Sequence, residues 1–203
     1  MNATLERHDF LRSRRSVRRF HQEPLDPEVV ERMLRTASSA SSAHNRQPWR
    51  FAVVSTATAR TRLAETMATA FRRDLEADGT APEKIQAVVE RSRARIESAP
   101  VAIVVCMDTT EMDMYPDARR AEAEQIMAVQ STANAATTLL LAAHAEGLGA
   151  VWNCGPLFAP NAVISALDLP TTWEPQALVL IGKPAEVPPE RTRKSMTAVS
   201  KFL

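Results

Sequence analysis

Five arginines stand within nine positions near the start of the chain, in the stretch RSRRSVRRF at residues 12–20. Arg14, Arg15 and Arg18 surround the hydroxyl group of Ser16, and the forked guanidinium group matches phosphate oxygens in pairs. If this stretch follows the end of a helix and turns, several of these groups can converge on one anion. The alternative is a solvated helix face, which is the usual place of charged side chains.

A second basic cluster, RTRK at residues 191–194, lies near the other end of a chain whose net charge is only +1. Basic and acidic residues are otherwise interspersed, which argues against a nucleic-acid stripe or a polybasic membrane patch. Two basic clusters at opposite ends of the sequence are more than the composition of a nearly neutral chain predicts.

The stretch SSAHNRQPWRF at residues 41–51 is a polar loop that runs directly into a predicted strand. The side-chain amides of Asn45 and Gln47 can donate and accept hydrogen bonds at the edge of a heteroaromatic ring. We therefore count this loop among the candidate ligand contacts.

Three of the five glycines gather in GLGAVWNCGP at residues 147–156. Scarce glycines used in this way indicate close backbone approach or a positive φ, so N–H groups near Gly155 could face a flat ligand. The alternative, a helix end followed by a turn, explains Gly147 and Gly149 well and Gly155 less well.

Motifs for metals, dinucleotides and serine nucleophiles are absent. The histidines lack metal-ligand spacing and H-E-x-x-H does not occur, so we expect no metal site. We expect surface or helix-packing roles for His8, His21 and His144. The pair Gly147-x-Gly149 follows a predicted helix instead of opening one, and Trp152 stands where a third glycine is needed, which excludes the Rossmann fingerprint. G-x-S-x-G is also missing.

The length of 203 residues predicts one domain, residues 1–203. Cys106 and Cys154 form no C-x-x-C pattern, which is typical of a reduced cytosolic protein. The first residues lack the apolar region of a signal peptide, and the apolar runs VAIVVCM and TTLLLAAHA are too short to span a bilayer. We predict a cytoplasmic protein without nucleic-acid or membrane partners.

Hydrophobic periodicity predicts an α+β domain of about four strands and five or six helices. The expected strands are 49–55, 101–107, 150–154 and 176–181. After a first helix before Arg14, the expected helices are 27–37, 63–75, 85–96 and 119–146. The stretch after Gly182 contains three prolines and should be irregular, whereas VSKFL at residues 199–203 could form an edge strand.

Four segments in this order resemble the nitroreductase family of FMN-dependent oxidoreductases: RRSVRRF (14–20), NRQPWRF (45–51), GLGAVW (147–152) and LIGKPAE (180–186). The resemblance covers the chain from about Leu5 to Leu203. It implies a nitroreductase-like fold, with a central mixed sheet of four to five strands flanked by helices. It also implies a domain-embracing homodimer with two FMN sites at the interface, in which a C-terminal segment of about 184–203 extends onto the partner.

By this resemblance, the FMN phosphate would be bound by Arg14 and Ser16 with support from Arg15. Arg191 and Arg193 match the late basic pair that completes the phosphate clamp in the family.

Other positions would contact the flavin ring by the same resemblance. Arg18 would approach the pyrimidine end of the isoalloxazine, and the main-chain N–H groups of Cys154 and Gly155 would face its N5 and O4 atoms. The loop that reaches the flavin of the other subunit matches Ser41, Ser42, Asn45 and Gln47. The proline usual in this loop is absent here, and His44 departs from the family pattern.

The resemblance implies that FMN takes a hydride from NAD(P)H and passes it to a nitro, quinone or enone-type molecule. The cofactor performs the electron chemistry, so no protein nucleophile or general acid is needed. Arg18 would stabilise negative charge on the reduced ring. We expect the Cys154 side chain to pack and not to act as a thiolate, because nothing in the sequence near it would activate one.

Two alternatives remain. Residues 60–78, 115–125 and 157–184 are similar to the nitroreductase-like C-terminal domain of ligases that add glutamate to the deazaflavin coenzyme (factor 420). This similarity implies a reductase of a dehydro precursor in the maturation of that coenzyme. The other alternative is a non-catalytic flavin- or deazaflavin-binding module.

Substrate choice is expected between residues 72 and 115. A group of apolar side chains there is either an adaptable lid over the flavin or ordinary core and loop: Met107, Met112, Met114 and Tyr115. Gln130 and Asn134, one helical turn apart, would line either the same pocket or the dimer interface.

Overall fold

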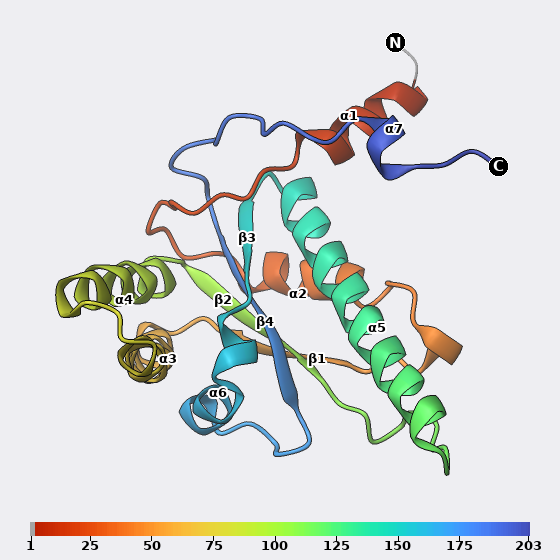
Figure 1. The fold of residues 1–203 in the computed structure, drawn as a ribbon. Helices are drawn as coiled ribbons and strands as arrows, with labels where there is room; N and C mark the ends of the chain where they lie inside the picture. The colour runs from red at the N-terminus through yellow and green to blue at the C-terminus, as the bar shows by residue number, and fades with distance from the viewer. Residues whose placement is uncertain (1–2) are drawn as a thin grey trace.

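The computed structural model describes residues 3–203, and its centre is one four-stranded sheet (Figure 1). The strands are β1 (Trp49–Val54), β2 (Val101–Met107), β3 (Gly149–Asn153) and β4 (Glu174–Gly182). Their order across the sheet is β1-β2-β4-β3, so that β1 and β3 form the two edges. The four predicted strands are confirmed to within two residues at each end.

All three strand pairings in the sheet are antiparallel. In the described part of the chain, the parallel pairing that a mixed sheet implies is limited to an isolated bridge between Ser16 and Ala150. The α+β fold class is confirmed, with the parallel component reduced to this single bridge.

The central strand β2 is a continuous apolar run in which every residue is buried, as a strand covered on both faces requires. Its side chains alternate between two hydrophobic cores: Ile103 and Val105 enter one, while Val104 and Cys106 enter the other. Each face of the sheet must therefore carry its own layer of helices.

One face is covered by α2 (Pro27–Ala37) and α5 (Ala118–Ala145). The predicted start of α2 is confirmed, because the Asp26 side chain accepts a hydrogen bond from the Glu28 N–H at 2.9 Å. The predicted end of α5 is confirmed as well, since Gly147 follows the helix with φ of +70°, the left-handed conformation that glycine adopts without strain.

Helix α5 is long and apolar enough to cross a membrane by length and composition alone. In the fold, half of its most apolar window is buried in protein, where small residues such as Ala135 and Ala136 allow it to pack closely on the sheet. Packing in the core therefore accounts for the buried half of this window.

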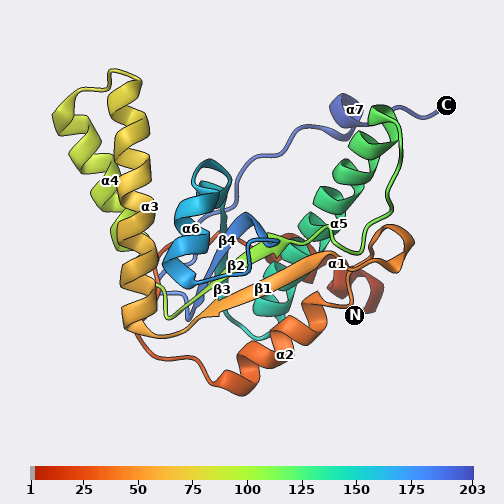
Figure 2. The ribbon, with the colours of Figure 1, turned by 90° about the horizontal axis from the view of Figure 1, so that it is seen from below.

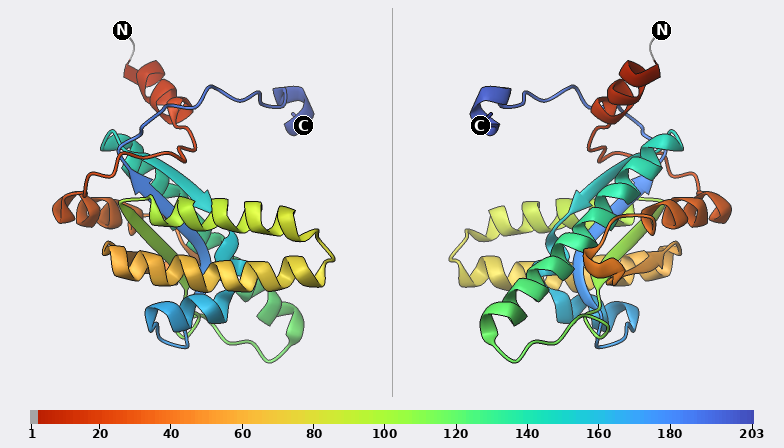
Figure 3. Two further views of the ribbon diagram at one scale, coloured as in Figure 1. Left: turned by 90° about the vertical axis from the view of Figure 1, so that its left-hand side faces the viewer. Right: turned by 90° about the vertical axis from the view of Figure 1, so that its right-hand side faces the viewer.

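The opposite face carries α3 (Ala57–Ala77), α4 (Pro82–Glu97) and α6 (Pro160–Leu167), and α6 and α2 lie on opposite sides of the sheet in Figure 2. Helices α3 and α4 run side by side as an antiparallel pair (Figure 3). Leu63 and Met67 of α3 enter the core, whereas Phe71 further along the same stripe is partly exposed. This stripe therefore leaves the core and is available to line a cavity.

The remaining elements are α1 (Ala3–Ser13), the short 3-10 helices η1 (Ala43–Asn45) and η2 (Gly155–Phe158), and α7 (Met196–Val199). Helix α1 and the C-terminal segment project from the same end of the body (Figures 1 and 3). The prediction of an edge strand at 199–203 is wrong: Val199 ends α7, and residues 200–203 pair with no strand in the described chain. Residues 3–203 form seven α-helices, more than expected, because α6 and α7 are too short to show a clear period.

Candidate functional site

A basic cavity of about 180 Å³ lies at the start of β3. Its walls come from the segment after α1, the end of α5, the start of β3 and the C-terminal segment. Arg14 lines it with a half-buried side chain, and its guanidinium group makes no hydrogen bond or ion pair with residues 3–203. A cation left without a protein partner in a cavity is a candidate binding group for an anion.

The arginine segment is fixed to the edge of the sheet by its backbone. The Val17 N–H donates to the Ala150 carbonyl at 3.0 Å, beside the bridge between Ser16 and Ala150. At the end of α1, the Phe10 ring stacks on the His144 ring with centroids 4.7 Å apart. His144 therefore packs between two helices, as predicted, and also lines the basic cavity, a place that the sequence did not indicate.

The predicted arginines only partly converge. Arg15 lines the same cavity as Arg14, where it donates to the Arg12 carbonyl at 2.6 Å and lies 3.4 Å from Glu190. Arg18 is not among the cavity residues; it is exposed and donates to the Ser16 carbonyl at 3.1 Å.

Arg18 lies close enough to α4 for its charge to act on a residue of that helix. Burial first, and then the positive charge of Arg18, lower the pKa of Arg95 on that helix. Within one subunit, Arg18 therefore adds to the positive charge near α4 and not to the basic cavity.

A larger cavity, of about 460 Å³, opens at the other end of β3. Apolar side chains from α3 and η2, including Phe71 and Phe158, form much of its wall together with Cys154 and Gly155. The Gly155 N–H donates to the Asn153 side chain at 2.7 Å, so in this conformation it is already occupied. The Cys154 thiol is exposed, and the packing role that we expected for it is not found in one subunit.

The loop at residues 41–47 lies on the other face of the sheet, against α5. The Ser42 hydroxyl accepts from the Gln47 N–H at 3.1 Å, and the Gln47 side chain donates to Asn45. Asn134 of α5 donates to Ser41 at 3.3 Å, which places this predicted pocket or interface residue beneath the loop, while Gln130 is exposed. The sheet therefore lies between this loop and the apolar cavity.

Three residues of this loop have positive φ: His44 at 49°, Asn45 at 54° and Gln47 at 50°. Side chains other than glycine adopt this conformation at a cost, and strained backbone is frequent where a loop serves a ligand. The strain supports the choice of this loop as a candidate site.

The late basic pair, Arg191 and Arg193, lies on the C-terminal segment and is not among the residues that line the basic cavity. Arg193 donates only to the backbone of its own segment, at Arg191 and Thr192. The Arg191 side chain is exposed and has no partner in the described chain. Neither guanidinium group pairs with another side chain in residues 3–203.

The predicted lid divides into two parts. Met107 and Met112 are buried in a small core with Ala128, so the ordinary core role is correct for them. Met114 is 96% exposed, and with Tyr115 it lines a third cavity of about 330 Å³, whose wall Met112 also reaches. These two residues remain candidates for contact with a substrate.

The fold and these cavities define a class of protein: an α+β domain in which one edge strand joins a basic cavity to an apolar one. Five residues of β3 at about 3.3 Å each separate Gly149 from Cys154 by roughly 16 Å. An elongated molecule with an anionic end and a flat apolar end has the chemistry to occupy such a surface.

Comparison with known proteins identifies the family. Residues 11–183 match the model of the nitroreductase family. The chain is 34% identical over 186 residues to the 5,6-dimethylbenzimidazole synthase of Rhodospirillum rubrum, covering 87% of this chain and 81% of that protein. It is 31% identical over 185 residues to the Bacillus subtilis protein YfhC, assigned as an NAD(P)H nitroreductase, covering 91% of this chain and 88% of that one. This chain belongs to the nitroreductase family.

A solved structure agrees with this assignment. A protein of Desulfovibrio desulfuricans, assigned as a nitroreductase and determined in complex with FMN, matches with a TM-score of 0.73 and 25% identity. The match covers 100% of this chain and 98% of the other. None of these three proteins is named as a deazaflavin ligase domain, so the narrower resemblance stays a prediction.

Proposed function

We propose that this protein is an FMN-dependent oxidoreductase that takes a hydride from NAD(P)H and delivers it to a small organic acceptor. The observation that carries the proposal is the half-buried Arg14 at one end of β3, whose side chain has no partner within residues 3–203, with an apolar cavity at the other end. The YfhC relative is named as an NAD(P)H nitroreductase, and the structure from Desulfovibrio desulfuricans contains FMN, which supports both cofactors.

The residues of this chain fit the cofactor by their chemistry. Arg14 and Arg15 supply guanidinium groups for a phosphate, and the Ser16 hydroxyl beside them is a further donor. The apolar cavity at Cys154 and Gly155 suits a flat ring, because excluding water there strengthens every polar contact to the ring. When bound, FMN supplies the hydride chemistry.

The protein's part in the reaction is to bind, orient and exclude water. A guanidinium group held close to the ring, the role proposed for Arg18, stabilises negative charge by roughly 3–4 kcal/mol if it is preorganised. The Gly155 N–H becomes available to the ring only if it leaves Asn153, so Asn153 competes with the ligand for this donor.

We further propose a homodimer in which the loop at Ser41–Gln47 reaches the cofactor of the partner subunit. Two observations support it: the loop lies on the other face of the sheet from the apolar cavity, and the C-terminal segment leaves the body (Figure 3). Arg191 and Arg193 have no side-chain partners within residues 3–203 and would complete the phosphate site across the interface. A cytoplasmic location is part of the same proposal.

The acceptor is proposed only as a class: nitro compounds, quinones or enone-type metabolites. Reduction of a dehydro precursor of the deazaflavin coenzyme remains an alternative, because α3, one of the segments behind that resemblance, lines the apolar cavity. The relative from Rhodospirillum rubrum adds 5,6-dimethylbenzimidazole as a product to be assayed.

The test uses the purified full chain. We expect a yellow protein that contains FMN by mass spectrometry and loses its colour stoichiometrically when NADH or NADPH is added under nitrogen. Colourless protein that takes up no FMN at micromolar concentration would disprove the proposal. Bound flavin that neither nucleotide reduces would instead identify a binding module without activity.

A further inference from the structure

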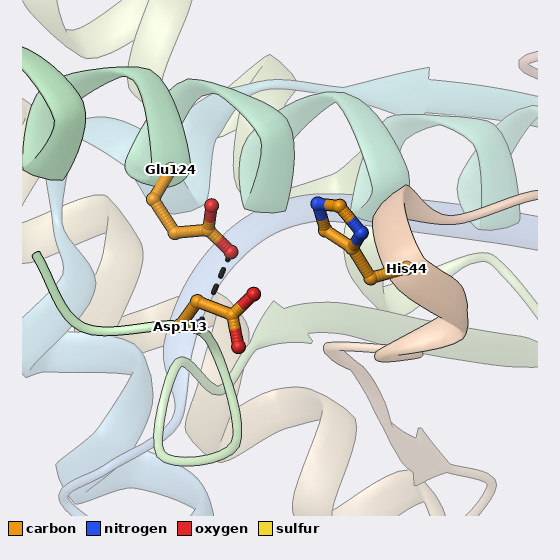
Figure 4. Close-up of side chains that lie close together, drawn as sticks. All are labelled: His44, Asp113 and Glu124. Carbon is orange, nitrogen blue, oxygen red and sulfur yellow. Dashed lines mark hydrogen bonds between the residues drawn. The ribbon is translucent and has the colours of Figure 1, made fainter.

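Three side chains that could bind a metal converge beside the third cavity, far from the basic cavity at β3 (Figure 4). They come from separate elements: His44 from η1, Asp113 from the loop between β2 and α5, and Glu124 from α5. One potential ligand atom of each lies within 4.8 Å of the other two. Residues up to 80 positions apart in the sequence thus meet at one point.

Glu124 is the least expected member of this cluster, because its side chain is only 3% exposed. One carboxylate oxygen, Oε1, accepts the Asp113 N–H at 3.2 Å. The other, Oε2, is buried and has no hydrogen-bond partner in residues 3–203. A buried polar atom without a partner is costly, so the fold retains an acceptor here that a ligand could satisfy.

His44 is held toward the carboxylates by its loop. Its backbone lies in the left-handed region, and the neighbouring Ala43 N–H donates to Ser131 of α5 at 3.1 Å. The imidazole makes no hydrogen bond or ion pair within the described chain. Such a ring presents a free nitrogen to the cluster, and neutral imidazole nitrogen is a good ligand for Zn²⁺ and its neighbours in the periodic table.

The Asp113 carboxylate also forms an ion pair within the protein. Arg46 pairs with its Oδ1 atom, which leaves Oδ2 as the potential ligand. Two acidic side chains thus face one guanidinium group at this point, and each keeps a carboxylate oxygen of the kind that divalent cations bind.

We propose that His44, Asp113 and Glu124 form a binding site for a divalent transition-metal ion, represented by Zn²⁺. One nitrogen and two carboxylate oxygens match the ligand types of zinc sites with three protein ligands. Bonds of about 2.1 Å place tetrahedral ligands roughly 3.4 Å apart. The ligand atoms now lie within 4.8 Å of one another, so the side chains must close by up to roughly 1.4 Å. The fourth position would open toward the cavity of about 330 Å³ that Asp113 and Glu124 line.

The site would join three separate parts of the fold. It would tie the loop at residues 41–47 to α5 and to the segment that carries Met114 and Tyr115. The inference goes beyond the proposed redox function and does not depend on it, because metal binding can be measured on protein without flavin. The sequence predicted no metal site, because its histidines lack ligand spacing, and one histidine that meets two distant carboxylates leaves no such spacing to find.

The experiment is a titration of untagged, chelator-treated full-length protein with Zn²⁺ against a chromophoric competitor. We expect one Zn²⁺ per chain for the wild type and at least 10-fold weaker binding for Glu124→Gln and for His44→Ala. The matched controls are Glu122→Gln, which changes an exposed carboxylate two residues away on α5, and His8→Ala on α1. Both variants should bind Zn²⁺ as the wild type does. Co²⁺ in place of Zn²⁺ should give visible absorption bands that both site variants lose.

Two results would overturn the inference. One is the absence of stoichiometric uptake up to ~100 µM free Zn²⁺, which would leave Glu124 as a buried carboxylate served by water. The other is equal affinity in the wild type and the site variants. Circular dichroism checks that each variant folds, and if Glu124→Gln does not, the exposed His44→Ala decides the question alone.

Discussion

Gly149 and Val17 touch so closely that a Cβ atom added to Gly149 would lie 2.7 Å from the Cβ atom of Val17. The close approach allows the segment Arg14–Val17 to lie against the start of β3. We predict that Gly149→Ala lowers the free energy of unfolding by about 1–3 kcal/mol, because the added methyl group must displace the segment. It should also weaken FMN binding, since Arg14 moves with the segment. Urea unfolding and a flavin fluorescence titration measure the two effects.

Gly79→Ala, in the turn between α3 and α4, is the matched control for this prediction. Gly79 has φ of +70°, and nothing lies within 4 Å of its added Cβ atom. The substitution should cost about 1–2 kcal/mol through backbone strain while leaving FMN affinity unchanged. If both variants bind FMN as the wild type does, the position of the arginine segment does not control the cofactor.

Arg14→Ala should weaken FMN binding by about 2 kcal/mol, the value of a charge-assisted contact to phosphate. Stability should change little, because the Arg14 side chain has no partner among residues 3–203 that would be left unsatisfied. Arg12→Ala removes an exposed arginine of α1 that pairs only with Asp9, and it serves as the control. Isothermal titration with FMN measures both. Equal affinity in wild type and Arg14→Ala would remove Arg14 from the site.

Local patterns were enough to predict most of the fold. The apolar run of β2, the Asp26 cap of α2 and the left-handed Gly147 after α5 are set by neighbouring residues, and the structure confirms each. The strand expected at 199–203 failed because a strand needs a partner, and this segment lies away from both edges of its own sheet.

The candidate site was predicted less completely, because its parts meet over long distances in sequence. Arg14 and Arg15 were recognised by type, but their convergence with His144 depends on how α1 packs against α5. The pairing of the Gly155 N–H with Asn153 is a matter of side-chain geometry that spacing cannot show. The meeting of His44 with Glu124 depends on a strained loop, for which no sequence signal was available.

The two cysteines should differ sharply in reactivity. Burial raises the pKa of Cys106 to about 12, whereas the Cys154 thiol is exposed at the apolar cavity. At pH 8, a thiol reagent should label one cysteine per folded chain and two after denaturation, because the thiolate is the reactive form. Labelling of Cys154→Ser identifies the fast thiol. Bound FMN should protect Cys154, and rapid labelling of Cys106 in the native protein would contradict the structure.

Asp108 should make stability depend on pH in the acid range. Burial favours its neutral form, but hydrogen bonds from the Thr110 hydroxyl at 2.7 Å and N–H at 3.0 Å, with Arg50 nearby, hold its pKa below the usual value. Because the pKa of Asp108 is lowered in the folded chain, its carboxylate contributes to the free energy of unfolding above about pH 3.9. This contribution is lost as the pH falls through the folded-state pKa.

Asp108→Asn tests this directly. It should lower the free energy of unfolding by about 1–3 kcal/mol at pH 7 and by less at pH 3, measured by urea unfolding at each pH. Asp9→Asn, an exposed carboxylate on α1, is the control for loss of a surface charge. A gap between wild type and Asp108→Asn that is as large at pH 3 as at pH 7 would show that its charge does not contribute.

Phe202 is 93% exposed near the end of a C-terminal segment whose helix α7 buries no residue in its own subunit. In the proposed homodimer this ring would pack on the partner, and its burial would contribute about 1.5–3 kcal/mol per contact. Phe202→Asp should therefore shift the protein toward monomer in light scattering after size exclusion, and weaken FMN retention. Lys201→Asp, an exposed neighbour, controls for the introduced charge. Because Phe202 is almost fully exposed in its own subunit, the substitution should not affect the unfolding of an isolated subunit. A Phe202→Asp protein that remains dimeric would show that this segment does not hold the subunits together.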